Sequence, residues 1–313
     1  MAGMPMRSTL LVTAGVAALV TAVAYVGSLD CDFAFDDHLA VAANSDVLGG
    51  RFDSIQDVLE WPGWRNDFWG RSLTNEASHK SWRPLTTLTF RLDHVVGELS
   101  ARQYHGTNLA LHALVSTAVG WLAWALSGGG GGGGGGSSGQ AVVAAALFAA
   151  HPVHVEAVTG VVGRAELLCA LFFLLAYAAY RRAAAAASTP SETGGGGGLL
   201  ARVLSLLACC LLYWASMLSK ETGVVFVGVA AVHEAAALAL PALLLATTGS
   251  ASCSRRRVIP PASAWFWALA RGLVLVACAV GYLSLRVPPT SSKGPPPKHL
   301  STNSHIFSHP QNA

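Results

Sequence analysis

Charged residues are scarce in this sequence of 313 residues. Asp, Glu, Lys and Arg together make up 12% of it, whereas soluble domains are nearer a quarter charged. Hydrophobic residues make up 52%, so the chain lacks the polar surface that would cover a water-exposed core, and we expect a bilayer to be its solvent. The formal net charge of +3 is too small to indicate a nucleic-acid partner. These shortages exclude an ordinary soluble domain and favour a membrane protein.

The sequence also contains no Asn-x-Ser/Thr sequon and no Cys-x-x-Cys motif, so neither glycosylation nor a redox pair is indicated. Cys31 is the only cysteine in the polar loop at residues 29–106, which excludes a disulfide within that loop. Four other cysteines lie inside apolar runs: Cys169, Cys209, Cys210 and Cys278.

The few acidic residues are concentrated in one segment. Of the 17 acids, 12 lie between Asp30 and Glu98, inside a polar segment that covers residues 29–106. This segment also holds Trp residues between its charges, which is typical of a folded domain at the level of the lipid headgroups. Within it, residues 55–61 and 85–96 have the pattern of short amphipathic helices that lie on a membrane. We therefore expect a membrane body with one large acidic loop.

Residues 10–27 form an unbroken apolar run long enough to cross a bilayer. The alternative is a cleaved signal peptide, with Ala22-Val23-Ala24 as a weak cleavage site. The run is long for a signal peptide, so we favour an uncleaved first helix. Six further apolar runs follow, and the second of these six contains His151-Pro152, where we expect a break: residues 107–127, 140–160, 165–180, 199–218, 222–246 and 264–285.

Seven spans predict a definite topology. With the N-terminus in the cytosol, the acidic loop is lumenal, and the clusters Arg181-Arg182 and Arg255-Arg256-Arg257 are both cytosolic, as the positive-inside rule requires. Ionisable residues then cluster at the boundaries of the spans, which disfavours a transporter. The predicted divisions are a first membrane helix at 1–28, the lumenal loop at 29–106, a helix bundle with Gly-rich loops at 107–286 and a disordered proline-rich tail at 287–313.

Asp36-Asp37 follows the first predicted span closely. A carboxylate held just outside the bilayer could take the proton from an acceptor hydroxyl while a lipid-borne donor lies in the membrane beside it. The alternative is a solvated or helix-capping acidic pair, because the loop contains many acids.

A second polar cluster runs from His151 to Glu166. His151 and His154 could bind a metal together with Glu156, but Pro152 lies between the histidines and no fourth ligand is evident, so we predict no metal site. Arg164 is the natural candidate for contacting a lipid phosphate. The alternative for the cluster is a helix start, in which polar side chains pair with free backbone groups.

Ser219-Lys220-Glu221 interrupts two apolar runs on the predicted lumenal side. Two interpretations stay open: a hairpin turn with an ion pair, or a second cation, Lys220, that contacts the same phosphate.

Several strings together resemble the N-terminal membrane half of the transmembrane-and-tetratricopeptide-repeat (TMTC) O-mannosyltransferases. They occur in the family's order and cover roughly residues 29–235. The strings are Phe35-Asp36-Asp37; Asn66-Asp67-Phe68-Trp69-Gly70; Ser78-His79-Lys80-Ser81-Trp82-Arg83-Pro84-Leu85; Leu88-Thr89-Phe90-Arg91-Leu92; residues 108–112; His151-Pro152-Val153-His154-Val155-Glu156-Ala157-Val158; Gly163-Arg164-Ala165-Glu166; and Lys220-Glu221-Thr222-Gly223. The further motif residues that we single out are His151, His154, Glu156, Glu166, Glu221, Lys80 and Arg83.

The resemblance implies an all-α, multi-pass enzyme of the endoplasmic reticulum membrane with the GT-C fold. Such enzymes transfer mannose from dolichyl-phosphate mannose to Ser or Thr of lumenal proteins, notably cadherins. They invert the anomeric centre and are taken to need no metal or other cofactor. The resemblance further implies that Asp36 is the catalytic base and that Asp37 orients the acceptor or tunes Asp36.

The family-like sequence stops after Leu285-Arg286, ahead of the family's tetratricopeptide repeats. We therefore expect a chain truncated before the repeats, with an impaired donor site. A non-catalytic membrane protein or binding subunit is the alternative function.

Overall fold

A computed structural model describes residues 6–128, 138–185, 197–239 and 262–286. These residues form an all-α, multi-pass membrane protein, with no strand among them apart from one isolated bridge between Asn66 and Ser72. The Gly-rich tracts lie largely outside the described residues. The cluster at 255–257 and the proline-rich tail lie wholly outside them.

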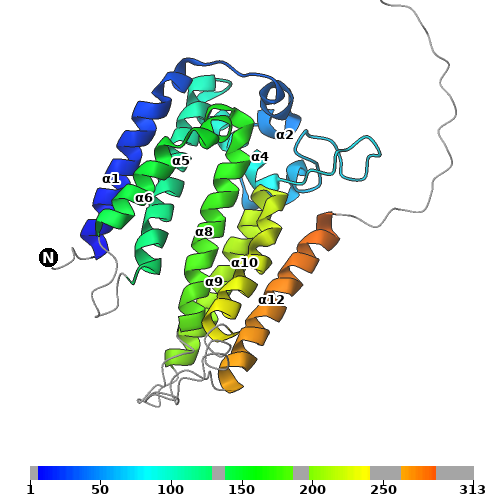
Figure 1. Ribbon diagram of the computed structural model, residues 1–313. Coiled ribbons are helices and arrows are strands. Elements are labelled where there is room, and N and C mark those ends of the chain that lie inside the picture. The colour runs from blue at the N-terminus through cyan, green and yellow to red at the C-terminus, as the bar shows by residue number, and fades with distance from the viewer. Residues whose placement is uncertain (1–5, 129–137, 186–196, 240–261, 287–313) are drawn as a thin grey trace, which may run out of the picture.

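Six described helical segments are long and apolar enough to cross a membrane, and the number is seven if one bent pair counts as a single span. The bend between Ser138–Ala150 and Pro152–Thr159 is 51°, which confirms the break expected at His151-Pro152. The helices of these spans are α1 (Met6–Tyr25), α5 (Ala101–Leu126), α6 (Ser138–Ala150) with η4 (Pro152–His154) and α7 (Val155–Thr159), α8 (Arg164–Ala185), α9 (Gly197–Ser219), α10 (Phe226–Glu234) with η7 (Ala235–Ala239), and α12 (Ala262–Arg286) (Figure 1).

Helices α1, α5 and α6 pack through stripes of small residues. The buried positions of each helix repeat every four residues, as one face of a helix requires: Thr9, Thr13, Ala17 and Thr21 on α1; Asn108, His112, Ser116 and Gly120 on α5; Ala141, Ala145 and Ala149 on α6. A Cβ on Gly120 would lie 2.6 Å from the Ala141 carbonyl oxygen and 2.7 Å from the Thr13 methyl group. Glycine is therefore required where these three helices meet, as is usual for close helix packing in lipid.

Helices α8, α9, α10 and α12 form a second group around a larger aromatic core. Its buried centre contains Tyr180, Tyr213, Phe226 and Tyr282, one from each helix. The Phe226 ring lies 5.1 Å from the Tyr213 ring and 6.2 Å from the Tyr180 ring. Contacts between α5 and α8 join the two groups.

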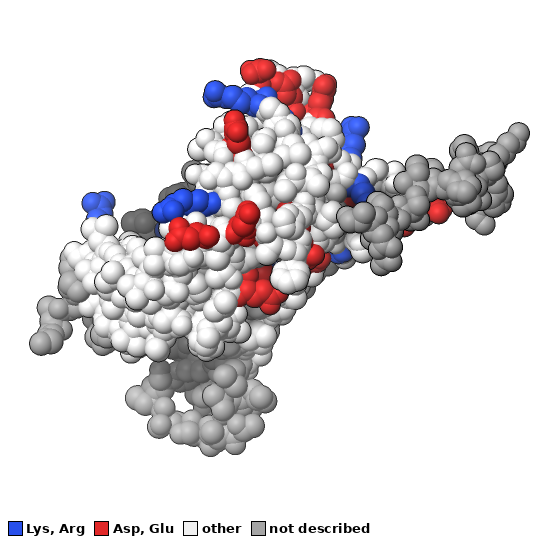
Figure 2. All heavy atoms as spheres, turned by 90° about the horizontal axis from the view of Figure 1, so that it is seen from above, with Lys and Arg blue, Asp and Glu red and all other residues white. Residues whose placement is uncertain are grey.

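The acidic segment between α1 and α5 folds over one end of the bundle, which we call the loop end. Both amphipathic segments are helical here: α3 covers Ile55–Glu60 and α4 covers Pro84–Gly97. Short helices η2 (His38–Ala42), α2 (Ser45–Leu48) and η3 (Pro62–Trp64) complete the segment. Seen from above the loop end, acidic and basic side chains stand out from an otherwise uncharged surface (Figure 2).

The tryptophans of this segment hold it together from within. Trp61 and Trp82 are 2% and 7% exposed, and their indole N–H groups donate to the carbonyls of Asp46 and Trp64. Asp46 is buried beside them; burial raises the pKa of its carboxyl, while two hydrogen bonds from the Asn66 amide favour the ionised form. The aromatic residues expected at the headgroups therefore serve partly as the core of a folded cap.

The two ends of the helix bundle carry different residues. One cavity at the loop end is lined by Asp37, Val162 and Lys220, and another, at the opposite end, by Arg182 and Met6. The residues that the topology assigns to the lumenal side therefore share one end, and the described arginine pair lies at the other.

This arrangement makes an experimental test of sidedness simple. A sequon engineered near Ser54 is expected to be glycosylated, because the loop end is predicted to face the lumen, whereas a sequon beside Arg181 is expected to stay unmodified. The measurement is the mobility shift of the expressed chain with and without glycosidase. Modification beside Arg181 would overturn the predicted orientation.

Candidate functional site

A cavity of about 1020 Å³ opens at the loop end between the folded cap and the bundle. Its polar wall contains charged side chains from the cap, from the turns before α8 and from the start of η6 (Glu221–Val225): Asp32, Asp36, Asp37, Arg83, Glu156, Glu166 and Lys220. Its other wall is mostly apolar and comes from the spans, including Val115, Phe148, Leu167 and Ala170. The cavity thus joins the membrane interior to the polar cap, which suits a substrate with a lipid tail and a polar head.

Asp36 lines this cavity with an exposed carboxylate. The residue before it, Phe35, is 94% exposed and has a positive φ of 48°, so the chain turns sharply there. Within the described chain, the Asp36 carboxylate makes no hydrogen bond and no ion pair. It is therefore available to a ligand.

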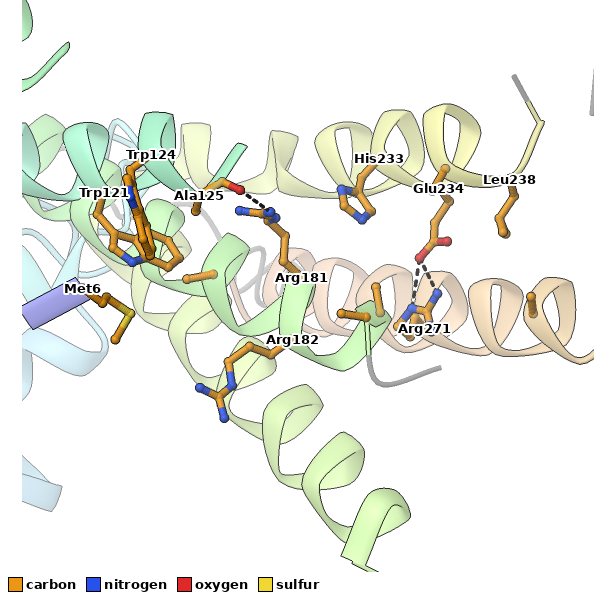
Figure 3. A pocket seen from close by; sticks show the side chains of 15 residues that line it. Met6, Trp121, Trp124, Ala125, Arg181, Arg182, His233, Glu234, Leu238 and Arg271 are labelled. Carbon is orange, nitrogen blue, oxygen red and sulfur yellow. Dashed lines mark hydrogen bonds and ion pairs between the residues drawn. The ribbon is translucent and has the colours of Figure 1, made fainter. Parts of the chain in front are cut away.

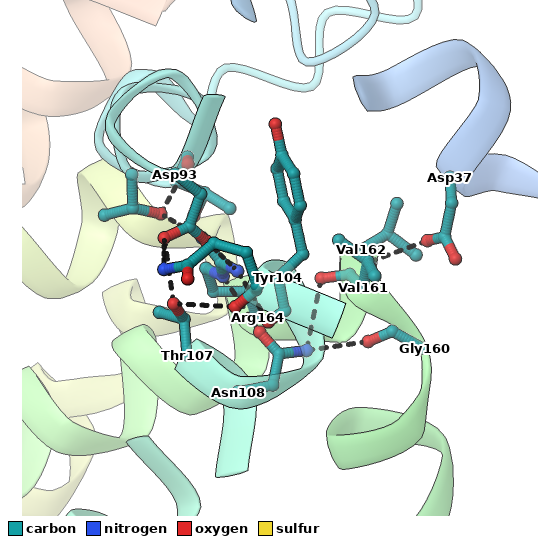
Figure 4. Close-up of polar contacts among 12 residues, drawn as sticks. Asp37, Asp93, Tyr104, Thr107, Asn108, Gly160, Val161, Val162 and Arg164 are labelled. Carbon is teal, nitrogen blue, oxygen red and sulfur yellow. Dashed lines mark hydrogen bonds and ion pairs between the residues drawn. The ribbon is translucent and has the colours of Figure 1, made fainter. Parts of the chain in front are cut away.

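Asp37 has a different environment although it is adjacent. It is 2% exposed, and its carboxylate accepts hydrogen bonds from the backbone N–H groups of Ala34 (3.1 Å) and Val162 (2.9 Å). The second bond ties the cap to the turn before α8, and Figure 4 shows Asp37 directed at this turn. Asp37 therefore holds the segment that carries Asp36.

Arg164, expected at a phosphate, does not line the cavity. Its side chain is fully buried, and Nη2 lies 2.6 Å from Oδ2 of Asp93 in α4. Nε donates to Asn108 Oδ1 at 2.8 Å, and Nη2 also donates to the Tyr104 carbonyl at 2.9 Å (Figure 4). The guanidinium also lies 4.7 Å from the centre of the Phe90 ring. Because the side chain is fully buried and does not line the cavity, we correct its assignment from a phosphate contact to a structural cation.

Asp93 is the residue that the sequence analysis missed at this point. Its Oδ1 accepts from Thr107 at 2.8 Å and from Gln103 at 3.3 Å, so the carboxylate joins α4 to both α5 and α8. The only signal in the sequence was its position on the buried face of the amphipathic helix that includes Phe90.

Two ion pairs place cations on the cavity wall. Lys220 Nζ pairs with Glu166, and both residues line the cavity. Arg83, also on the wall, forms a two-pronged pair with Glu221, with both nitrogen–oxygen distances at 2.9 Å. Lys220 can therefore form an ion pair at a turn and also contact a ligand phosphate, because the Lys220–Glu166 pair lies on the cavity wall.

The histidines of the second cluster separate. His151 Nδ1 accepts from the Val153 backbone N–H at 3.2 Å and so caps the short turn η4, as the helix-start interpretation predicts. His154 lines the cavity with its ring 4.1 Å from that of Phe148, and Glu156 lines the cavity with an exposed carboxylate. Across the described ranges no three His, Cys, Asp or Glu side chains converge in a metal-binding geometry.

Lys80 lies outside the cavity. It has a positive φ of 57°, and Nζ donates to the carbonyls of Leu73 and Asn75 within the cap. Its backbone carbonyl accepts from Arg286 Nε at 3.0 Å. Lys80 therefore stabilises a turn and joins the cap to α12.

The expectation that ionisable residues avoid the interior of the spans is wrong at one place. Glu234 and Arg271 lie within two predicted spans and form an ion pair with an oxygen–nitrogen distance of 2.5 Å. Each residue lies in a run that was assigned from its apolar residues, although a lone charge in such a run itself indicates a residue of opposite charge nearby.

Comparison with known proteins identifies relatives of the matched part of the chain. Protein O-mannosyl-transferase TMTC3 of Mus musculus is 40% identical over 158 residues, which are 50% of this chain and 15% of that protein. Protein O-mannosyl-transferase Tmtc1 of Drosophila melanogaster is 39% identical over 155 residues, 50% of this chain and 16% of that protein. Protein O-mannosyl-transferase tmtc2 of Xenopus laevis is 37% identical over 216 residues, 67% of this chain and 22% of that protein.

The alignments with these three relatives thus span only 15% to 22% of each relative's length. No family model matches the sequence, and no solved structure matches it. The matches are nevertheless about 40% identical over half of the chain, and four differently numbered TMTC proteins are among the relatives. Over about half of its length the chain is therefore similar to the TMTC protein O-mannosyl-transferases.

Proposed function

We propose that this chain is the membrane module of a protein O-mannosyltransferase that transfers mannose from dolichyl-phosphate mannose to Ser or Thr hydroxyls. The observation that carries the proposal is the cavity at the loop end, where the unpartnered carboxylate of Asp36 faces a space bounded on one side by lipid-facing spans. The names of its relatives supply the sugar and the protein acceptor. The proposed setting is the endoplasmic reticulum membrane, with the loop end in the lumen and cadherin-like domains as acceptors.

The proposed reaction is a single displacement with inversion. The acceptor oxygen bonds to the anomeric carbon, its proton passes to the Asp36 carboxylate, and the bond from that carbon to the phosphate oxygen breaks. The electron pair leaves with dolichyl phosphate, so negative charge develops on the phosphate. Cations on the cavity wall would stabilise that charge, and Lys220 and Arg83 are the residues in position to do so.

In this proposal Lys220 exchanges its partner. Without donor it pairs with Glu166; with donor bound, the phosphate takes the place of the carboxylate or joins it. The Lys220 side chain is 20% exposed and Glu166 is 50% exposed, so the pair is accessible to a ligand. The fully buried Arg164–Asp93 pair has no such access.

Replacement of Lys220 by Ala is expected to raise the KM for dolichyl-phosphate mannose roughly 10- to 100-fold, because a charge-assisted hydrogen bond contributes about 1.5–3 kcal/mol. The measurement is transfer of radiolabelled mannose to an acceptor protein at several donor concentrations, in a form of the protein that transfers. Arg102→Ala is the matched control, because Arg102 is an exposed cation of the same end, paired with Asp30 outside the cavity.

An unchanged KM in Lys220→Ala would remove Lys220 from the donor site. An absence of mannose transfer both from this chain and from longer forms that carry the same residues would support the non-catalytic alternative instead.

A further inference from the structure

A second cavity, of about 400 Å³, lies at the end of the bundle opposite the loop end. Its lining comes from five spans: Met6 of α1, Trp121 and Trp124 of α5, Arg181 and Arg182 of α8, His233 and Glu234 of α10, and Arg271 of α12. Figure 3 shows these side chains around a common space, with the arginines of α8 between the two tryptophans and the Glu234–Arg271 pair. Nothing in the proposed transfer reaction uses this cavity.

The single acid of this cavity is already neutralised. Glu234 Oε1 accepts from Arg271 Nε at 3.0 Å and Nη2 at 2.5 Å, and from the Tyr180 hydroxyl at 2.5 Å. The Arg271 and Glu234 side chains are 7% and 16% exposed, so the pair is held away from water. It contributes no net charge to the cavity.

The two remaining arginines have no acidic partner within the described ranges. Arg181 donates one N–H group to the Ala125 carbonyl, at 3.0 Å, and its other guanidinium donors make no hydrogen bond or ion pair among those residues. Arg182 is exposed and makes no hydrogen bond or ion pair there. Among the described residues, the cavity therefore carries two positive charges without an acidic partner, next to a wall of membrane-spanning helices.

The position of the cavity selects the kind of anion. Arg181 follows Arg164 by 17 residues on one helix, which is a rise of about 25 Å, so the two cavities face opposite leaflets of the membrane. Trp121 and Trp124 at the rim are residues that favour the depth of lipid headgroups, and most of the remaining lining is apolar, such as Ala178, Ala264 and Leu238. A water-soluble anion gains nothing from such a wall, whereas a lipid has acyl chains to cover it.

We infer that this cavity binds the phosphate headgroup of an anionic phospholipid from the leaflet opposite the loop end. Arg181 and Arg182 contact the phosphate, since guanidinium groups match phosphate oxygens in two-pronged hydrogen bonds. The tryptophans hold the glycerol region, and the Glu234–Arg271 pair forms the closed inner wall. A bound lipid would contact α5, α8 and α10 together.

The inference is tested by native mass spectrometry of the full chain, released from micelles that contain equal amounts of phosphatidylglycerol and phosphatidylcholine. We expect phosphatidylglycerol to be retained at least about 10-fold more often. The variant Arg181→Gln/Arg182→Gln is expected to abolish this preference. The control Arg51→Gln/Arg65→Gln removes the same charge from exposed positions at the loop end and is expected to keep it.

The single variant Arg182→Gln controls for misfolding, because Arg182 is exposed and has no partner among the described residues. It is expected to lower the preference for phosphatidylglycerol several-fold at an unchanged Tm. Equal retention of both lipids, or the same loss in the loop-end control, would overturn the inference. Displacement of phosphatidylglycerol by millimolar inorganic phosphate would also overturn it, because the cavity would then bind free phosphate rather than a lipid.

Discussion

Asp36→Asn is expected to lower the rate of mannose transfer by roughly 10²–10⁴-fold, the usual loss on removing a positioned base. The amide keeps the shape of the side chain and cannot take the proton of the acceptor hydroxyl. Because the Asp36 carboxylate is exposed and makes no contact among the described residues, the Tm should not change. The measurement is kcat for mannose transfer, together with the melting temperature in detergent, in a form of the protein that transfers.

Asp37→Asn provides the comparison. An amide oxygen can replace one carboxylate oxygen as an acceptor, but the amide N–H₂ group then faces the backbone N–H of Ala34 or Val162. Leaving one buried donor unpaired costs about 1–3 kcal/mol, so this variant should lose Tm as well as activity, and the activity loss should be smaller than that of Asp36→Asn. Near-normal turnover in Asp36→Asn beside an inactive Asp37→Asn would reverse the assignment, and two near-normal variants would remove the motif from the chemistry.

Arg164→Ala is expected to destabilise the fold by about 3–5 kcal/mol, the usual cost of breaking a buried ion pair from one side. It would leave the Asp93 carboxylate, the Asn108 amide oxygen and the Tyr104 carbonyl without their donor. The measurements are the yield of monodisperse protein in size-exclusion chromatography and the shift in Tm.

Arg164→Lys makes the test more specific. A lysine keeps the charge next to Asp93, but its single ammonium group cannot also donate to Asn108 and Tyr104 as the planar guanidinium does. We expect an intermediate loss of Tm and an unchanged donor KM in the protein that does fold. A variant with normal Tm and a large rise in donor KM would return Arg164 to the donor site.

The sequence predicted the positions of the candidate spans well, because span length and apolar composition are local properties. The break at His151-Pro152 was predictable for the same reason: proline removes a backbone donor at a known position. The shared end of Asp36 and Lys220 followed from the alternation of the spans.

The roles of the polar side chains were less predictable, because they depend on partners distant in the sequence. Arg164 and Asp93 are separated by 71 residues, and no local pattern pairs them. Asp36 and Asp37 look equivalent in sequence, yet the turn at Phe35 leaves one exposed and buries the other. Glu234 and Arg271 were each hidden in an apolar run until the helices were placed side by side.

The bend after α6 has a consequence for the surrounding lipid. With 13 residues, α6 is about 20 Å long, whereas the hydrocarbon core of a bilayer is about 30 Å thick. The chain then bends by 51° into η4 and α7. If the span ends at this bend, the bilayer is expected to thin along this edge, with headgroups of the loop-side leaflet closer to its centre. Lipid phosphates would then lie nearer to Phe148 and His154, which line the loop-end cavity. A lipid-linked sugar would therefore enter the loop-end cavity laterally, from the thinned region of the bilayer.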